Sequence, residues 1–245
     1  MFVGDNSGSM REQQERLIAS FPAFIEAITE TLDTVDSVHV GVVTSDAYAS
    51  NAASCRSLGA LVDHSESGAC GPFADGNRFL TENDDLAAGF SCIANVGTDG
   101  DSLERPVSAL VEAVSASQLE PGGCNEGFLR SDALLVVVVI TDDVPFWSDM
   151  DDAHIATPTN AWQPAIVDAK DGNPNGMVVI GFVPWGDLEC MSSVYADESP
   201  NLIRFVEDFD DRGVLASVCS DDYGPIFDES IAVIDQSCDD FVPAG

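Results

Sequence analysis

The sequence predicts an α/β fold in which a mostly parallel sheet is covered by helices on both faces. Residues 134–141 (LLVVVVIT) form a nearly continuous run of apolar, mostly β-branched residues, and residues 177–183 (MVVIGFV) repeat this pattern. Such runs are typical of central parallel strands that are buried on both sides. Segments with apolar residues at helical spacing lie between the expected strands, and this alternation favours a doubly wound sheet. The 245 residues contain no linker-like segment, so we expect a single domain over residues 1–245.

The elements at the beginning of the chain follow from shorter patterns. The first strand is expected directly before Asp5 and has only four residues, so we expect a truncated strand of a longer protein whose leader is not in this chain. Apolar residues at helical spacing from 17 to 32 predict a helix. Pro22 is expected to kink or restart this helix, with Ser20 as a cap. Residues 38–44 (VHVGVVT) predict a short buried strand.

The rest of the chain continues the alternation of strands and helices. Residues 45–75 are rich in Ser, Ala and Gly, contain two cysteines, and are expected to form a long loop excursion. Beyond it, the apolar pattern predicts helices over residues 84–95, 103–119, 202–209 and 226–238, and strands over residues 134–141, 177–183 and 214–219. We find no internal repeat. The longest apolar run, residues 133–140, is too short to span a bilayer, so membrane insertion is not expected.

The chain is strongly acidic. Its 43 acidic and 9 basic residues give a formal net charge of −34. This charge argues against nucleic acid and anionic membrane surfaces as partners. Because the acidic residues are scattered among apolar ones, the pattern indicates a folded protein with a solvated acidic surface, suited to salty or calcium-rich surroundings as in halophilic proteins. The alternative is a set of calcium loops, but residues 149–152 (DMDD) lack the glycine and the terminal glutamate of an EF-hand.

The seven cysteines indicate an oxidising compartment. They are spaced too widely for a zinc site, and no Cys-x-x-Cys pair occurs. Several lie in loops rich in Gly and Ser, which favours disulfides. The sequence leaves the pairing open, and we expect Cys55 to pair with Cys70 and Cys219 with Cys238. The odd number implies at least one free thiol or a partner outside this chain.

Asp5, Ser7 and Ser9 form the most informative local pattern. They alternate directly after the first strand, so their side chains can converge on one point if the chain leaves the strand extended. Converging carboxylate and hydroxyl oxygens suit a hard divalent cation such as Mg2+. The alternative is a capped strand–helix turn in which the serines bind free amides. Asp142 leaves the strand 134–141 at the same edge of the sheet, and Thr98 adds a third hydroxyl from a loop before a helix.

Together these residues resemble a von Willebrand factor type A domain. The resemblance rests on Asp-x-Ser-x-Ser after the first strand, Gly97-Thr98 before a middle helix, and Ile-Thr-Asp ending at Asp142, and it spans nearly the whole chain. It implies a three-layer, Rossmann-like fold with a metal ion-dependent adhesion site for Mg2+, with Ca2+ or Mn2+ as alternatives. The metal ligands that it implies are Asp5, Ser7, Ser9, Thr98 and Asp142. Asp143 stands where the family often has glycine, and we place Asp143 and Asp99 beside the site or on its rim.

The resemblance also implies a function. In this family the metal keeps an open coordination position that an acidic side chain of a partner fills, so we expect a protein or glycan ligand that offers a carboxylate. The cysteine-bearing arrangement is similar to secreted bacterial members, which indicates an exported protein at the cell surface or outside the cell. We expect the chain not to be an enzyme.

Two other functions remain open. One is a metal-assisted hydrolase that uses Asp5, Asp142 and Asp143, and the other is a structural scaffold module of a larger surface protein. A serine protease is disfavoured because the sequence contains no Gly-x-Ser-x-Gly elbow and none of its three histidines lies in a motif. Phosphoryl transfer is disfavoured because no glycine-rich loop with lysine occurs.

Overall fold

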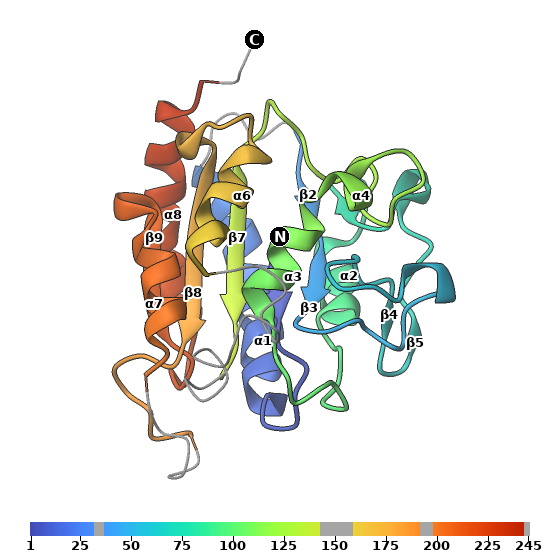
Figure 1. Ribbon diagram of the computed structural model, residues 1–245, viewed down its shortest axis with the longest axis horizontal. Coiled ribbons are helices and arrows are strands. Elements are labelled where there is room, and N and C mark those ends of the chain that lie inside the picture. The colour runs from blue at the N-terminus through green and yellow to red at the C-terminus, as the bar shows by residue number, and fades with distance from the viewer. Residues whose placement is uncertain (32–36, 143–158, 192–197, 243–245) are drawn as a thin grey trace.

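A computed structural model describes residues 1–31, 37–142, 159–191 and 198–242. Its centre is a five-stranded sheet in which all neighbouring strands run parallel (Figure 1). In spatial order the strands are β3 (Val42–Thr44), β1 (Phe2–Gly4), β7 (Leu135–Ile140), β8 (Met177–Val183) and β9 (Gly213–Ser217). The expected α/β class with a parallel central sheet is therefore confirmed.

Helices cover both faces of this sheet because successive strand residues point to opposite sides. Val138 and Ile140 of β7 belong to one hydrophobic cluster, whereas Val137 and Val139 belong to the other. The first cluster joins the sheet to α1 (Arg11–Thr31), α2 (Leu86–Ile93) and α8 (Gly224–Asp240). The second joins it to α3 (Pro106–Ala113), α6 (Trp162–Asp168) and α7 (Pro200–Glu207). The molecule thus has three layers, with the helices of the two clusters on opposite sides of the sheet (Figure 1).

Helix α1 is longer than the sequence pattern suggests. It begins at Arg11, directly after the Asp-x-Ser-x-Ser segment, and runs through Pro22 without a restart. The expectation that Ser20 caps a second helix is therefore wrong. Proline removes only one backbone hydrogen bond, and Phe21 and Phe24 on either side of it are almost fully buried in the first cluster. Their burial stabilises the continuous helix against the lost bond.

Two other helical segments also differ from expectation. The helix expected over 103–119 is two helices, α3 and α4 (Ala116–Leu119), and α3 begins only at Pro106. Proline has no backbone N–H and suits the first turn of a helix, which explains why 103–105 stay outside. Helix α6, which the apolar pattern did not indicate, fills a place in the second cluster through Trp162 and Ile166.

The excursion after β3 is folded onto the domain by disulfides. It contains the short hairpin of β4 (His64–Ser65) and β5 (Gly68–Ala69), two 3-10 turns (Ala53–Cys55 and Ala74–Gly76), and then β6 (Leu80–Thr81), which pairs antiparallel with β2 (His39–Val40). A third 3-10 turn (Thr159–Ala161) precedes α6, a fourth (Pro174–Gly176) precedes β8 and a fifth (Asp210–Arg212) precedes β9. The disulfides are Cys55–Cys124, Cys70–Cys92 and Cys190–Cys219.

Both expected cysteine pairs are wrong. Cys55 and Cys70 each bond to a segment outside the excursion rather than to each other, so the disulfides close the excursion against the core. Cys238 is the free thiol among the described cysteines. It lies near the end of α8, about 20 Å along the helix from its start at Gly224, whereas Cys219 lies five positions before that start. The helix expected over residues 226–238 already separates Cys238 from Cys219 in space, so the expected pair conflicts with that helix.

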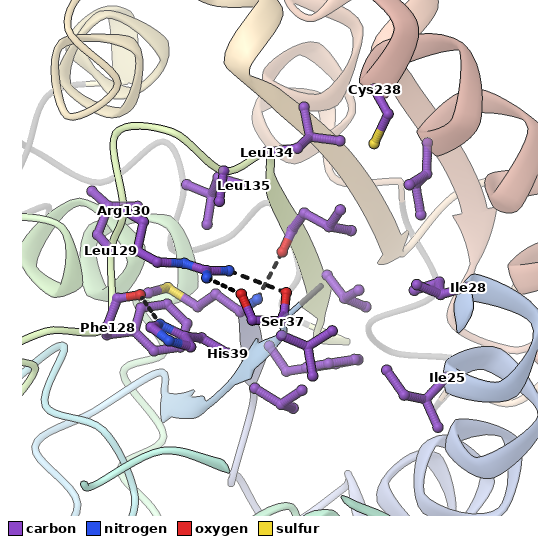
Figure 2. A pocket seen from close by; sticks show the side chains of 18 of the residues that line it. Ile25, Ile28, Ser37, His39, Phe128, Leu129, Arg130, Leu134, Leu135 and Cys238 are labelled. Carbon is purple, nitrogen blue, oxygen red and sulfur yellow. Dashed lines mark hydrogen bonds between the residues drawn. The ribbon is translucent and has the colours of Figure 1, made fainter. Parts of the chain in front are cut away.

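A pocket of about 460 Å3 opens near the amino ends of β1 and β7, lined by apolar side chains together with Ser37, His39, Arg130 and Asp132 (Figure 2). Arg130 donates to the hydroxyl and the carbonyl of Ser37, and Nδ1 of His39 lies 2.7 Å from the carbonyl of Phe128. Because Asp5 follows the carboxyl end of β1, the pocket lies at the opposite end of these strands from Asp5. None of the described helices is long and apolar enough to cross a bilayer.

The two disulfides of the excursion close loops of different length, which gives a measurable order of stabilities. Cys55–Cys124 spans 69 residues and Cys70–Cys92 spans 22. Because the loop-closure entropy of the unfolded chain grows with loop length, removing Cys55–Cys124 is expected to cost about 1 kcal/mol more than removing Cys70–Cys92. Urea unfolding of C55A/C124A and C70A/C92A without reductant measures this difference. C238S is the control and should change stability little; a larger loss in C70A/C92A would contradict the loop-closure account.

Candidate metal centre

The carboxyl ends of β1 and β7 are adjacent, and this is the point where strand order reverses. Gly4 of β1 lies in register with Ile140 of β7, and the Asp5 amide donates to the Ile140 carbonyl at 3.0 Å. From β1 the chain runs through α1 to β3, which lies beside β1 on one side. The later strand β7 lies beside β1 on the other side. In open α/β sheets such a switch point is the usual place for a ligand. Asp5 and Asp142 both leave the sheet here.

Asp5 is fully buried and is held by three neighbouring groups. One carboxylate oxygen accepts from the Ser7 amide at 2.7 Å and the other from the Thr141 hydroxyl at 2.7 Å. The Asp5 carbonyl accepts from the side-chain amide of Gln14 at 3.0 Å. Burial raises the pKa of Asp5 above its ordinary value, although the hydrogen bonds from Ser7 and Thr141 act in the opposite direction. The hydrogen bonds therefore fix the position of the Asp5 carboxylate, and burial destabilises its ionised form.

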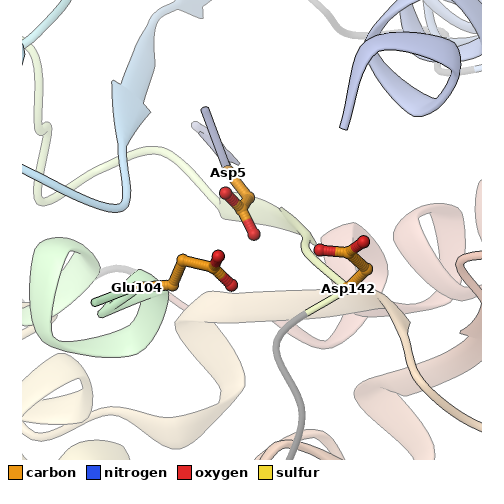
Figure 3. Close-up of side chains that lie close together, drawn as sticks. All are labelled: Asp5, Glu104 and Asp142. Atoms are coloured by element: carbon orange, nitrogen blue, oxygen red, sulfur yellow. The ribbon is translucent and has the colours of Figure 1, made fainter. Parts of the chain in front are cut away.

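Asp5, Glu104 and Asp142 bring three carboxyl groups together (Figure 3). One oxygen from each lies within 4.8 Å of the others, and the three groups point toward one another from β1, from the loop before α3, and from the end of β7. The neighbouring Glu104 side chain acts to lower the pKa of Asp5, against the larger effect of burial. Burial and, secondly, the charge of Asp5 raise the pKa of Asp142. The close approach of these three carboxyl groups favours either a proton on one of them or a cation bound between them.

The two serines of the motif lie against the same carboxyl groups. The Ser7 hydroxyl is 3.3 Å from the Ser9 hydroxyl, and Ser9 is hydrogen-bonded to Asp142. Ser7 is buried and Ser9 is exposed. The structure therefore brings Asp5, Ser7, Ser9 and Asp142 to one edge of the sheet, as the spacing of the motif suggests.

The loop of Thr98 also packs against this edge, but the Thr98 hydroxyl has another partner. Gln14 donates to the Gly97 carbonyl at 2.8 Å as well as to Asp5, and thereby ties the loop to the first strand. The Thr98 hydroxyl accepts from the guanidinium of Arg11 at 3.1 Å. Among the described contacts it is therefore bound to Arg11 and not to the carboxyl groups.

Asp99 and Asp143 are the other residues that the sequence places near the site, and Glu104 is an addition from the structure. Asp99 is exposed, which agrees with a place on the rim. Asp143 lies outside the described residues, so its proposed place beside the site stays a prediction. Glu104 was not among the candidates from the sequence, because it belongs to no spaced motif and stands near several other acidic residues of the same loop. Its only signal is its place just before the helix that begins at Pro106.

Gly100 explains how the loop approaches so closely. Its amide donates to the Asn6 carbonyl at 2.9 Å, and a Cβ atom at this position would lie 2.5 Å from the Asn6 side chain. Such a distance is far inside van der Waals contact, so only glycine fits here without displacing Asn6. Asn6 is itself held by Asp46 and Ser45. The loop that delivers Glu104 is thus packed against the residue next to Asp5.

The chemistry of the donor set is that of a hard cation site. Three carboxylates and two hydroxyls provide only oxygen ligands, which Mg2+, Ca2+ and Mn2+ prefer over the nitrogen and sulfur ligands of zinc or copper. The carboxylates are close enough for a single ion to touch all three. The residues present therefore fit the class of metal that the sequence motif indicates.

A comparison of the chain with models of known protein families gave no match, and a comparison with curated proteins gave none either. The case for a function therefore rests on the geometry of this site.

Proposed function

We propose that Asp5, Glu104 and Asp142 bind a divalent cation, Mg2+ foremost, with Ca2+ or Mn2+ as alternatives. The observation that carries this proposal is the approach of their carboxylate oxygens to within 4.8 Å of one another. At an effective dielectric constant of about 20, each ionised pair at this distance repels by about 3 kcal/mol. A cation between them replaces this repulsion with attraction. Ser7 and Ser9 are placed to add hydroxyl oxygens.

The proposal extends to an adhesion site like that of von Willebrand factor type A domains. Support comes from the positions of Asp5 and Asp142 at neighbouring strand ends and from the serines beside them. The departure is that Glu104 joins the carboxylates while Thr98 is bound to Arg11. The ligand set that we propose for this chain is therefore Asp5, Ser7, Ser9, Asp142 and Glu104.

The proposed role is to hold a partner through the metal. A cation held at the edge of the sheet keeps a position open toward solvent, and a carboxylate of a protein or glycan partner would complete its coordination. The net charge of −34 repels acidic partners at a distance, but the Debye length is about 8 Å at physiological salt, so a partner meets the metal mainly at contact. Three disulfides are typical of an oxidising environment, which supports a place outside the cell or on its surface.

Isosteric variants test the metal site directly. D5N, D142N and E104Q each remove one negative charge from the group, so we expect each to weaken Mg2+ binding by about a hundredfold or more. Isothermal titration calorimetry on protein treated with EDTA measures the affinity, and thermal melting in EDTA checks that each variant is folded.

D99N is the matched control for these variants. It removes one negative charge, as the other variants do, and lies in the same loop as Glu104. Asp99 is exposed and outside the group of three carboxyl groups, so we expect the Mg2+ affinity to change by less than about threefold after screening by salt. Unchanged affinity in D5N and D142N would refute the site. An effect of E104Q no larger than that of D99N would remove Glu104 from the ligand set.

Metal binding is also expected to depend on pH. Burial raises the pKa of Asp5 and of Asp142, so protons compete with the cation at a higher pH than for ordinary carboxylates. As pH is lowered, the apparent Mg2+ affinity should therefore begin to fall before the ordinary carboxyl range near pH ~4 is reached. Calorimetry between pH ~7 and pH ~4.5 measures the fall. A constant affinity down to pH ~4.5 would show that the carboxyl groups are not protonated in the metal-free protein.

The same shift gives a prediction for stability without metal. An acid whose pKa is raised by folding binds its proton more tightly in the folded state, so its contribution to stability is lost as pH rises through the raised pKa. In EDTA, wild-type protein should therefore lose stability relative to D5N as pH rises from ~4 to ~7. Added Mg2+ should reverse the order at pH ~7. If the stabilities of wild type and D5N in EDTA changed with pH in the same way, Asp5 would not ionise with a raised pKa in the folded protein.

Hydrolysis is the activity that would overturn the adhesion role. We expect no Mg2+-dependent turnover of ester, phosphoester or peptide substrates, because a hydrolase needs a general base beside the metal. In the described part of the chain, the three carboxyl groups at the site are all used as metal ligands in this proposal, and the imidazoles of His39 and His64 are bound to the Phe128 carbonyl and to Asp63. Turnover that disappears in both EDTA and D5N would favour the hydrolase instead.

A further inference from the structure

Arg11 is placed to act on the proposed metal site. It is the first residue of α1 and follows Ser9 by two positions. Its guanidinium is exposed and donates to the Thr98 hydroxyl at 3.1 Å. The inference below rests on the proposed metal binding and concerns which oxygens the cation receives.

Arg11 is one of several arginines in the described part of the protein that bind neutral oxygens. Arg130 binds Ser37 and Arg204 binds Thr159 in the same way, whereas Arg16, Arg78 and Arg212 form ion pairs. Arg11 has no carboxylate within 4.0 Å among the described residues, although three carboxyl groups gather at the neighbouring strand ends. Its hydrogen bond goes instead to the neutral oxygen of Thr98.

This contact occupies a hydroxyl of the loop that Gln14 and Gly100 tie to the segment of Asp5, so the oxygen lies on a segment that borders the proposed cation. A threonine hydroxyl has one proton and two acceptor lone pairs. A guanidinium N–H that donates to this oxygen brings a positive charge within about 3 Å of it, and a divalent cation on the same oxygen would be strongly repelled at that separation. Arg11 and the cation therefore cannot both be well bound to Thr98. With Thr98 held, the oxygen donor that this loop brings to the group is the third carboxylate, Glu104.

We propose that Arg11 competes with the cation for the Thr98 hydroxyl and thereby fixes the ligand set and the metal affinity of the site. Arg11 is a positioning residue: it acts through Thr98 and does not touch the metal. While Arg11 holds Thr98, the cation is bound by Glu104 with Asp5 and Asp142. When Arg11 is removed, Thr98 becomes free to join the coordination sphere.

A double-mutant cycle separates this competition from the simple effect of a nearby charge. Mg2+ affinity is measured by calorimetry for wild type, R11Q, T98V and R11Q/T98V, at physiological salt. Removing a positive charge near a cation site raises affinity in any case, by about two- to threefold after screening. We expect R11Q to raise it by about tenfold when Thr98 is present, because the freed hydroxyl adds a ligand, and only by the smaller factor in the T98V background.

R204Q is the matched control for loss of an arginine. Arg204 on α7 also donates to a threonine hydroxyl, that of Thr159, at 3.4 Å, and it is not part of the group at Asp5. R204Q should leave Mg2+ affinity within about twofold of wild type. Melting curves in EDTA show whether all variants are folded.

The outcomes distinguish this inference from the proposal on which it rests. An equal gain from R11Q with and without Thr98 would mean that Arg11 acts only as a distant charge, which overturns the competition and leaves the metal site intact. A larger gain in the T98V background would also overturn it. Absence of Mg2+ binding in wild type and in every variant would overturn the proposed function itself.

Discussion

The close approach of the carboxyl groups of Asp5, Glu104 and Asp142 is the constraint on which the rest of this structure depends. Their oxygens approach within 4.8 Å at the end of the sheet, with Asp5 fully buried. Without a cation, burial raises the pKa of both Asp5 and Asp142, so their charged forms are disfavoured in the folded protein. A site that is costly when empty and favourable when filled is a common arrangement for a functional centre.

The surrounding fold maintains this close approach by fixing the segments that carry the carboxylates. Thr141 and the Ser7 amide hold the side chain of Asp5, and Gln14 joins its backbone to the loop at Gly97. Gly100 lets that loop pack directly on the residue after Asp5. Behind these contacts, the parallel pairing of β1 with β7 keeps Asp5 and Asp142 adjacent. The site is therefore held by the backbone of the sheet and by buried amides rather than by surface ion pairs.

Much of this arrangement could be predicted from the sequence. The apolar runs gave β7 and β8 nearly to the residue, and the parallel sheet followed from them. Two features of the structure depend on contacts between distant segments, which local patterns do not contain. The disulfides pair the excursion with the core, and Glu104 reaches the site through the packing of Gly100 on Asn6. The partner of Thr98 was missed for the same reason, because Arg11 meets it across 87 positions of sequence.

The central claim is that one cation lies among Asp5, Glu104 and Asp142. A crystal structure of the wild-type protein grown with Mn2+, with anomalous diffraction recorded to locate the metal, tests it most directly. We expect one strong peak between the three carboxylates, with a Glu104 oxygen at about 2.2 Å from the metal and the Thr98 hydroxyl still bound to Arg11. Absence of a peak at this edge of the sheet, or a metal that all three carboxylates leave unbound, would contradict it.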